Sequence, residues 1–214
     1  PAKGARVKIL VSLGAKVIDT PNVVGQSEAA GKKTLTDANL LVVEPSIQYF
    51  SATVPAGMVI QVQGPDGKPL GVKVNEGTKV TMAVSIGAVP KVAGMSEADA
   101  TKALTAVKLN VGTVKQDFSD TIPSGQAISV TTPEGNFGPG ANVTLVMSKG
   151  PDMVTVPNVI GMTIADAVAK LQSLGFGATS NAPAPYWAQL PVKSQSVAAG
   201  SQAKRGTTIA VNNP

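Results

Sequence analysis

The sequence predicts an α+β protein of tandem small two-layer units, each a helix packed on a short antiparallel sheet. Three observations predict it. A proline-containing opening occurs three times at nearly constant spacing, a helical apolar stripe follows each opening, and segments of alternating polarity follow each helix. Self-similarity at a fixed period defines a repeat architecture before any single residue is interpreted.

The opening is the clearest repeated element. Thr-Pro-Asn-Val-Val-Gly at 20–25 returns as Val-Pro-Lys-Val-Ala-Gly at 89–94 and as Val-Pro-Asn-Val-Ile-Gly at 156–161. Its prolines are 69 and 67 residues apart. A closing block also recurs, as Gly-Thr-Lys-Val from Gly77, Gly-Ala-Asn-Val from Gly140 and Gly-Thr-Thr-Ile from Gly206.

These registers divide the chain into complete repeats at 17–87, 88–152 and 153–214. Residues 1–16 match the closing block, so we expect them to be the end of a preceding repeat. The chain is then expected to begin inside a unit and to be a piece of a longer protein.

Each predicted helix begins at a hydroxyl residue and carries one apolar face. Ser96 and Thr163 each precede an aspartate by three positions, which is a variant of the capping box. Apolar residues then follow at helical spacing, as at Ala100 and Leu104. Gly31 inside the first helix is expected to weaken it by roughly 1 kcal/mol relative to alanine.

Three residues are expected to end the helices in the left-handed conformation. Gly175 suits that position best, Asn39 tolerates it, and Lys108 is the least comfortable. After each helix the polarity alternates with period two, as in Val143-Thr144-Leu145. The joints between repeats are only a few residues long, so we expect the units to line up as an elongated rod.

Composition excludes several classes of protein. There is no cysteine, so no disulfide stabilises these small units. The net charge of +5 is spread as +4, −1, −1 and +3 over residues 1–16, 17–87, 88–152 and 153–214. No cluster of basic residues with interleaved aromatics appears, which argues against nucleic-acid binding. No apolar run approaches the ~18 residues that a membrane helix needs.

The residues of this chain do not support catalysis. Histidine and cysteine are absent, which removes the usual general base and the strongest nucleophile. The glycines at 135, 138 and 140 lie between two predicted strands and fit the turn of the repeat, not a phosphate loop. Glu97 and Asp99 are two positions apart and do not share a helix face. We therefore expect no catalytic residue, no metal site and no cofactor.

An aromatic pair is the strongest binding candidate. Tyr186 and Trp187 lie in a proline-rich stretch, and Trp187 is the only tryptophan. Aromatic faces are platforms for sugar rings, and both side chains also donate hydrogen bonds. Trp187 is alternatively expected to fold back over the helix and enlarge a small core, or to contact another protein.

With these motifs, the chain resembles the PASTA repeat of bacterial serine/threonine kinases and penicillin-binding proteins. The Pro-x-Val-x-Gly opening, the helix with its Ala and Leu, and the late Gly-Thr-x-Val strand carry the resemblance. Two departures concern loops: residues 64–75 are longer than their counterparts, and Val197 stands where the family usually has proline.

The number of copies favours the kinase over the penicillin-binding protein. The resemblance then implies a wall-sensing region, outside a bacterial plasma membrane and within the cell wall, anchored through an upstream transmembrane helix. Its implied partners are peptidoglycan fragments (muropeptides) and a second copy of itself. The alternatives are the C-terminal region of a penicillin-binding protein and a structural spacer array.

Charge and aromatic residues place the expected ligand contacts in the third repeat. It is the only complete repeat with a net positive charge. A guanidinium grips a carboxylate in two places, so Arg205 suits the stem-peptide carboxylates of a muropeptide. A solvated hairpin tip is the alternative interpretation of Arg205. The expected ligand-binding residues are Tyr186, Trp187, Lys193 and Arg205.

The rod is testable by small-angle scattering. A compact globule of this length has a radius of gyration of roughly 17 Å. Short joints between repeats predict a value well above that figure. A measured radius near that of the globule would mean that the repeats fold back on one another.

Overall fold

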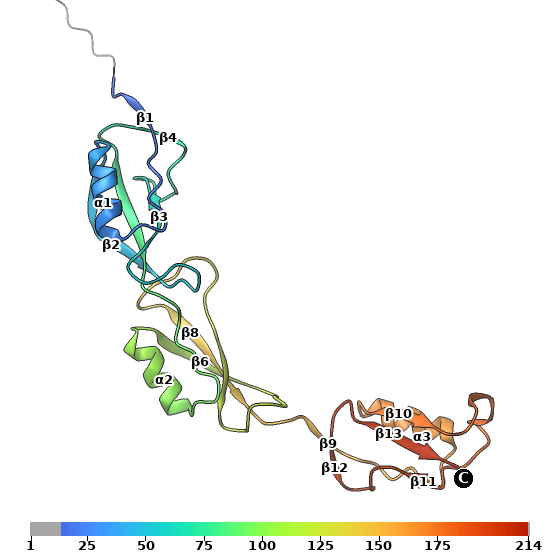
Figure 1. Cartoon of the computed structure of the whole chain (residues 1–214). Helices are drawn as coiled ribbons and strands as arrows, with labels where there is room; N and C mark the ends of the chain where they lie inside the picture. Colours follow the sequence, from blue (N-terminus) through green and yellow to red (C-terminus); the bar gives the residue numbers. More distant parts are fainter. Residues whose placement is uncertain (1–13, 214) are drawn as a thin grey trace, which may run out of the picture. The chain divides into compact units, whose positions relative to one another are not determined.

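The computed structural model describes residues 14–213, in which each copy of the repeat has one helix and its own strands (Figure 1). The predicted partial copy at 1–16 therefore lies, except for its last three residues, outside the described residues. The first repeat contains β1 (Val17–Asp19), α1 (Glu28–Asp37), β2 (Leu41–Tyr49), β3 (Val59–Gln63), β4 (Lys73–Asn75) and β5 (Lys79–Ser85).

In the second and third repeats, as in the first, the strands of the three-stranded sheet follow the helix. The second contains α2 (Glu97–Ala106), β6 (Asn110–Asp117), β7 (Ala127–Thr131) and β8 (Asn142–Ser148). The third contains β9 (Met153–Thr155), α3 (Ile164–Ser173), β10 (Gly177–Ser180), the 3-10 helix η1 (Ala184–Tyr186), β11 (Ser194–Gln195), β12 (Gln202–Lys204) and β13 (Thr208–Asn212).

Contacts group the chain into two compact units whose boundary runs through the second repeat. One unit contains the residues up to Lys91 with Thr101–Gly112 and Thr131–Thr144. The other contains Val92–Ala100, Thr113–Val130 and the residues from Leu145 onward. The junction of the first and second repeats thus lies inside one unit, and the junction of the second and third lies inside the other.

Each repeat has a three-stranded sheet with its last long strand in the middle, in the orders β2-β5-β3, β6-β8-β7 and β10-β13-β11. In the first repeat β5 pairs parallel with β2 and antiparallel with β3. In the third, β13 pairs parallel with β10 and antiparallel with β11. The expectation of a purely antiparallel sheet is therefore wrong for these two repeats. Two chain reversals separate the outer strand from the central one and restore the original direction.

The first and third repeats also begin with a two-stranded antiparallel ribbon. β1 pairs with β4 in the first repeat, and β9 pairs with β12 in the third. Among the described residues, the second repeat has no such ribbon. Its joint is shorter, because only two residues separate Gly87 from Pro90, whereas six separate Gly150 from Pro157.

Hydroxyl side chains cap the helices as predicted. The Asp99 N–H donates to Ser96 Oγ at 3.1 Å, and the Asp166 N–H donates to Thr163 Oγ1 at the same distance. Each hydroxyl in turn donates to the carboxylate of its aspartate. The aspartate thus orients the capping hydroxyl, because its short side chain binds the hydroxyl and not the backbone of the capping residue.

The left-handed helix ends are confirmed at all three predicted positions. Gly175 has a φ of +83°, and Asn39 and Lys108 have φ values of 59° and 62°. Glycine has no Cβ and adopts this conformation without strain. A lysine there carries a steric penalty that the surrounding repeat must offset.

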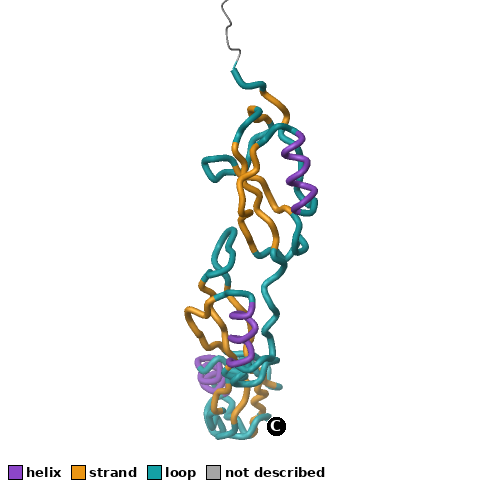
Figure 2. Tube along the Cα trace, turned by 90° about the vertical axis from the view of Figure 1, so that its left-hand side faces the viewer, coloured by secondary structure: helices purple, strands orange, loops and turns teal. Residues whose placement is uncertain are grey.

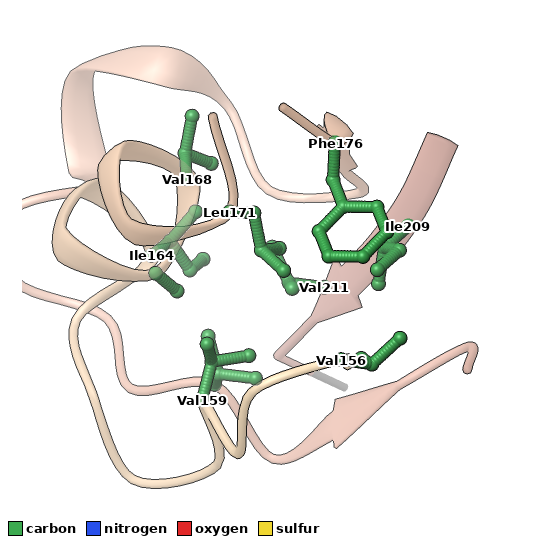
Figure 3. Packing of buried hydrophobic residues seen from close by; sticks show 10 residues of the cluster. Val156, Val159, Ile164, Val168, Leu171, Phe176, Ile209 and Val211 are labelled. Atoms are coloured by element: carbon green, nitrogen blue, oxygen red, sulfur yellow. The ribbon is translucent and has the colours of Figure 1, made fainter. Parts of the chain in front are cut away.

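The apolar face of each helix packs on its own sheet. In Figure 3, Leu171 of α3 points toward Val211 of β13, and Ile164, Val168, Phe176 and Ile209 belong to the same buried cluster. In the first repeat α1 lies along one side of the strands (Figure 2), and Leu35 is fully buried. Gly31 has a packing reason: a Cβ there would lie 3.0 Å from Val59 Cγ2.

The glycine that ends each Pro-x-Val-x-Gly opening segment has a positive φ, and this conformation generates a stability prediction. Gly94 has a φ of +82°, so a β-branched side chain is strained there whatever space surrounds it. Gly94→Val is expected to destabilise the second repeat by about 1–3 kcal/mol. Amide hydrogen exchange resolved by residue measures this, and the third repeat is expected to lose much less.

Ala93→Val is the matched control for Gly94→Val. Its counterparts, Val24 and Ile160, already carry β-branched side chains, so this variant is expected to keep the stability of the wild type. Equal loss of protection in all repeats after Gly94→Val would contradict the modular arrangement.

Candidate functional site

Trp187 is half-buried against the core of the third repeat. Its side chain packs on the hydrophobic cluster of α3 and β13, and its Nε1 donates a hydrogen bond to the Ala182 carbonyl at 2.8 Å. The Ala165 N–H of α3 donates to the Trp187 carbonyl at 3.1 Å. The indole therefore uses its donor inside the repeat and holds the proline-rich loop on the start of the helix.

Tyr186 and Lys193 are exposed. Tyr186 ends η1 and leaves 55% of its surface accessible, although its neighbour Trp187 is held against the core. Lys193 directly precedes β11, and its backbone N–H donates to the Asn212 carbonyl. Within residues 14–213, the Lys193 ammonium takes part in no ion pair. Both side chains are free to meet a ligand.

Arg205 is engaged at the opposite end of α3. Its Nε lies 2.6 Å from Asp152 Oδ2, and its Nη1 donates to the Leu174 carbonyl at 2.9 Å. The second contact satisfies a carbonyl at the end of the helix, where a cation is also favoured by the helix dipole. The left-handed Gly175 leaves room for the guanidinium, because a Cβ there would lie 2.6 Å from Nη1.

The four predicted binding residues do not form a single site. The Trp187 carbonyl is bonded at Ala165, and Arg205 is bonded at Leu174. Nine residues of helix place these two positions about 13 Å apart along the axis. Tyr186 and Trp187 thus lie at one end of α3 and Arg205 at the other.

A shallow cleft of about 510 Å³ includes Arg205. Its other lining residues are Phe118, Ser119, Asp120, Asp152, Gly175 and Gly206. Phe118 leaves 47% of its surface exposed, and Lys149 Nζ lies 3.9 Å from the centroid of its ring. Lys204 Nζ lies 3.5 Å from Asp120 Oδ1. The lining thus contains an aromatic ring, two carboxylates and one guanidinium, and two further ammonium groups pair with the ring and with Asp120.

Comparing the repeats shows that the pair of Arg205 with Asp152 in this cluster has a structural role. Sequence reasoning missed this pair. In the first repeat, Glu76 N–H donates to the Lys16 carbonyl, and their side chains form an ion pair at 3.3 Å. In the third repeat, Arg205 N–H donates to the Asp152 carbonyl, and their side chains pair with the charges exchanged. An alignment of the repeats matches Lys16 with Asp152 and Glu76 with Arg205, and the exchanged charges at these positions reveal the pair.

No metal or cofactor site was expected in this chain. In the part of the chain from 14 to 213, no group of three or more histidine, cysteine or carboxylate residues is placed to hold a metal ion. In the same range, no helix is both long enough and apolar enough to cross a membrane.

The fold of the repeats defines a modular array of small α+β domains, and comparison with known proteins identifies the modules. The family model of the PASTA domain matches residues 18–86, 87–149 and 154–212. The chain therefore belongs to the PASTA domain family and contains three PASTA domains.

Related proteins carry the same array. The chain is 32% identical over 200 residues to the probable serine/threonine-protein kinase PknB of Corynebacterium glutamicum. It is 30% identical over 213 residues to a probable serine/threonine-protein kinase of Corynebacterium efficiens. These alignments cover 89% and 94% of the chain, but only 29% and 30% of the two kinases.

Two solved structures of the same family are also similar. One is the three-PASTA-domain of a Ser/Thr kinase from Staphylococcus aureus, with a TM-score of 0.46, 21% identity and coverage of 91% of this chain and 97% of that one. The other is the entire extra-cellular region of the Ser/Thr kinase PrkC from the same species, with the same TM-score, 20% identity and coverage of 91% and 69%.

The contacts of Trp187 predict that it stabilises the third repeat. Trp187→Ala removes half-buried aromatic packing and the hydrogen bond to Ala182, and is expected to cost about 2–3 kcal/mol. Hydrogen exchange of the α3 amides measures this loss. Tyr186→Ala is the control, because it truncates an exposed neighbour. Unchanged α3 protection in Trp187→Ala would show that the indole does not support the core.

Proposed function

We propose that this chain is the peptidoglycan-sensing, extracellular region of a bacterial receptor-type serine/threonine protein kinase. The observation that carries the proposal is the three tandem PASTA domains shared, at 30–32% identity, with bacterial serine/threonine kinases. The chain matches less than a third of those kinases, so the kinase activity of the whole protein is part of the proposal.

The proposed ligand is a muropeptide, and the third repeat provides the proposed contacts. Tyr186 presents an exposed ring for a sugar face, and the free ammonium of Lys193 suits a stem-peptide carboxylate. Trp187 positions Tyr186 by holding the loop on α3. Arg205 contributes a guanidinium next to the exposed ring of Phe118, with Nε and Nη1 already engaged by the chain.

The same contacts determine how strongly and how specifically the ligand binds. Exposed ion pairs contribute little and are screened by salt, so binding through Lys193 and Arg205 is expected to be modest. Association of receptor chains in the membrane would add avidity to weak single contacts. A second copy of this chain is therefore the proposed protein partner.

A titration of the whole chain with purified muropeptides tests the proposal. In NMR spectra, the shifted amides are expected to cluster around Tyr186, Lys193 and Arg205, and the affinity is expected to fall as salt increases. Tyr186→Ala is expected to weaken binding about 3-fold to 10-fold, as the loss of one stacking contact implies.

Tyr49→Ala is the matched control, because it removes the other tyrosine from the first repeat and is expected to leave the affinity unchanged. Shifts confined to the first or second repeat would reject the proposed site. Absence of any shift at saturating muropeptide would leave the spacer array as the function. The residues upstream of Pro1 decide the parent protein: a kinase domain and a transmembrane helix support the proposal, and a transpeptidase domain rejects it.

A further inference from the structure

The first repeat contains a cavity, open to solvent, at the position where the third repeat has the side chain of Gln195. The cavity has a volume of about 280 Å³ and lies between the opening segment, strand β3 and the loop before β4. Pro21 and Val23 line it from the opening segment, Val62 from β3, and Leu70 from the loop. All of these residues belong to one compact unit.

The backbones of the first and third repeats match around this position. The Val24 N–H donates to Asn22 Oδ1 at 3.2 Å, and the Ile160 N–H donates to Asn158 Oδ1 at 3.1 Å. The N–H of the next glycine donates to the Val59 carbonyl of β3 in the first repeat and to the Val192 carbonyl, just before β11, in the third. The two opening segments therefore present the same peptide groups to their sheets.

Sheet register places Val62 and Gln195 at the same point. Val62 pairs with Met82 on β5, and Gln195 pairs with Val211 on β13. Met82 is five residues after Gly77, and Val211 is five residues after Gly206, so the two partners are equivalent. The first repeat thus has an aliphatic side chain where the third repeat has a carboxamide.

The carboxamide of Gln195 is fully used. Its Oε1 accepts from the Val159 N–H at 3.0 Å. Its Nε2 donates to the Pro157 carbonyl at 3.2 Å and to the Val197 carbonyl at 2.7 Å. One primary amide therefore pairs with both the Val159 N–H and the Pro157 carbonyl, which lie on either side of Asn158 in the opening segment.

In the first repeat the same donor and acceptor have no partner. No group in residues 14–213 accepts from the Val23 N–H, and none donates to the Pro21 carbonyl. Val23 is only 1% exposed. Pro21 is half-buried. A peptide N–H of a buried residue gains from a hydrogen-bond partner, so this pair favours an occupant that supplies both a hydrogen-bond acceptor and a donor.

The loop of the first repeat makes room for such an occupant. Nine positions separate Val62 from Gly71, whereas five separate Gln195 from the equivalent Gly200, so the first repeat has four additional residues (9 − 5). The added residues form the turn in which the Gly64 N–H donates to the Lys68 carbonyl, and Pro69 and Leu70 then complete the cavity wall.

We propose that the cavity of the first repeat is a binding site for a primary carboxamide carried by a ligand. The Val23 N–H donates to the carbonyl oxygen of the ligand, and the Pro21 carbonyl accepts from its amide nitrogen, as Val159 and Pro157 do with Gln195. Val62 and Leu70 contact the aliphatic stem. The site does not depend on the proposed muropeptide contacts of the third repeat.

Amide geometry makes the expected specificity sharp. A primary amide and a lactam carry an N–H on the same side as the carbonyl oxygen and can reach both backbone groups at once. A trans secondary amide has its N–H on the opposite side, and a carboxylate has no donor. An unpaired buried group discriminates strongly against a ligand that lacks its partner.

The probe is propionamide, which reproduces the end of the glutamine side chain. In the whole chain, about 100 mM propionamide is expected to move the Val23 amide proton downfield and slow its exchange, at the weak affinity that so few atoms allow. The lactam 2-pyrrolidinone is expected to act similarly. N-methylpropionamide and propionate are expected to leave Val23 unchanged. Equal effects from all four probes, or no effect from propionamide, would overturn the proposal.

Two variants test the same site from within the chain. V62Q supplies the carboxamide and is expected to slow exchange of the Val23 amide about fivefold or more, and to abolish its response to propionamide. V62M is the control, because it fills similar space without an amide and is expected to leave Val23 exchange fast. Equal protection of the Val23 amide in V62Q and V62M would overturn the proposal. If V62Q does not fold, the probe series on the unmodified chain still tests the proposal.

Discussion

One pair of backbone hydrogen bonds organises every repeat. The glycine that ends each opening segment donates to a residue at the start of, or just before, the second strand of the three-stranded sheet, and the same residue donates back to the residue that follows the glycine. These contacts recur at Gly25 with Val59, at Gly94 with Ala127 and at Gly161 with Val192, at 2.8–2.9 Å. A unit of this size without disulfides has a small core. The turn held by these two hydrogen bonds, the pinned turn, compensates for the small core, because it fixes the start of the helix and the edge of the sheet together.

The positive φ of these glycines permits this reciprocal pair of backbone hydrogen bonds. The turn directs the chain from the opening segment into the capping residue within two positions, and the helix then packs across the sheet. Ala100 and Ala167 are fully buried in the helices at the point where the first repeat has Gly31. Small residues are needed there, because the pinned turn brings the helix backbone close to the residue that the glycine bonds, as Gly31 lies close to Val59.

Local chemistry made much of this fold predictable. The caps at Ser96 and Thr163 and the left-handed positions at Asn39, Lys108 and Gly175 depend on neighbouring residues only, and the sequence contains all of that information. The parallel pairing of β2 with β5 was not predictable in this way, because strand direction depends on contacts between distant segments. The alternation of polar and apolar residues is the same for both directions.

The candidate site likewise contains residues whose setting could be predicted from the sequence and residues whose setting could not. Tyr186 and Lys193 were predictable as exposed groups from their loop and strand-edge positions. The hydrogen bond from Arg205 to the Leu174 carbonyl was not, since it requires the end of α3 to meet the hairpin tip. Trp187 was ambiguous in the sequence because aromatic side chains serve both cores and ligands, and only its neighbours show which surface it covers.

The two junctions between repeats are chemically different, and this has a consequence for the order of the array. Phe50 of the first repeat stacks on Phe137 of the second, with ring centroids 5.5 Å apart, and Gly138 lies against the Gln48 carbonyl. At the next junction Lys204 meets Asp120. The third repeat has Ala203 in place of Phe137, and the first has Ala52 in place of Asp120. Each junction therefore depends on side chains that the other repeat lacks at the equivalent position. The order of the repeats in the array cannot be changed without losing these contacts.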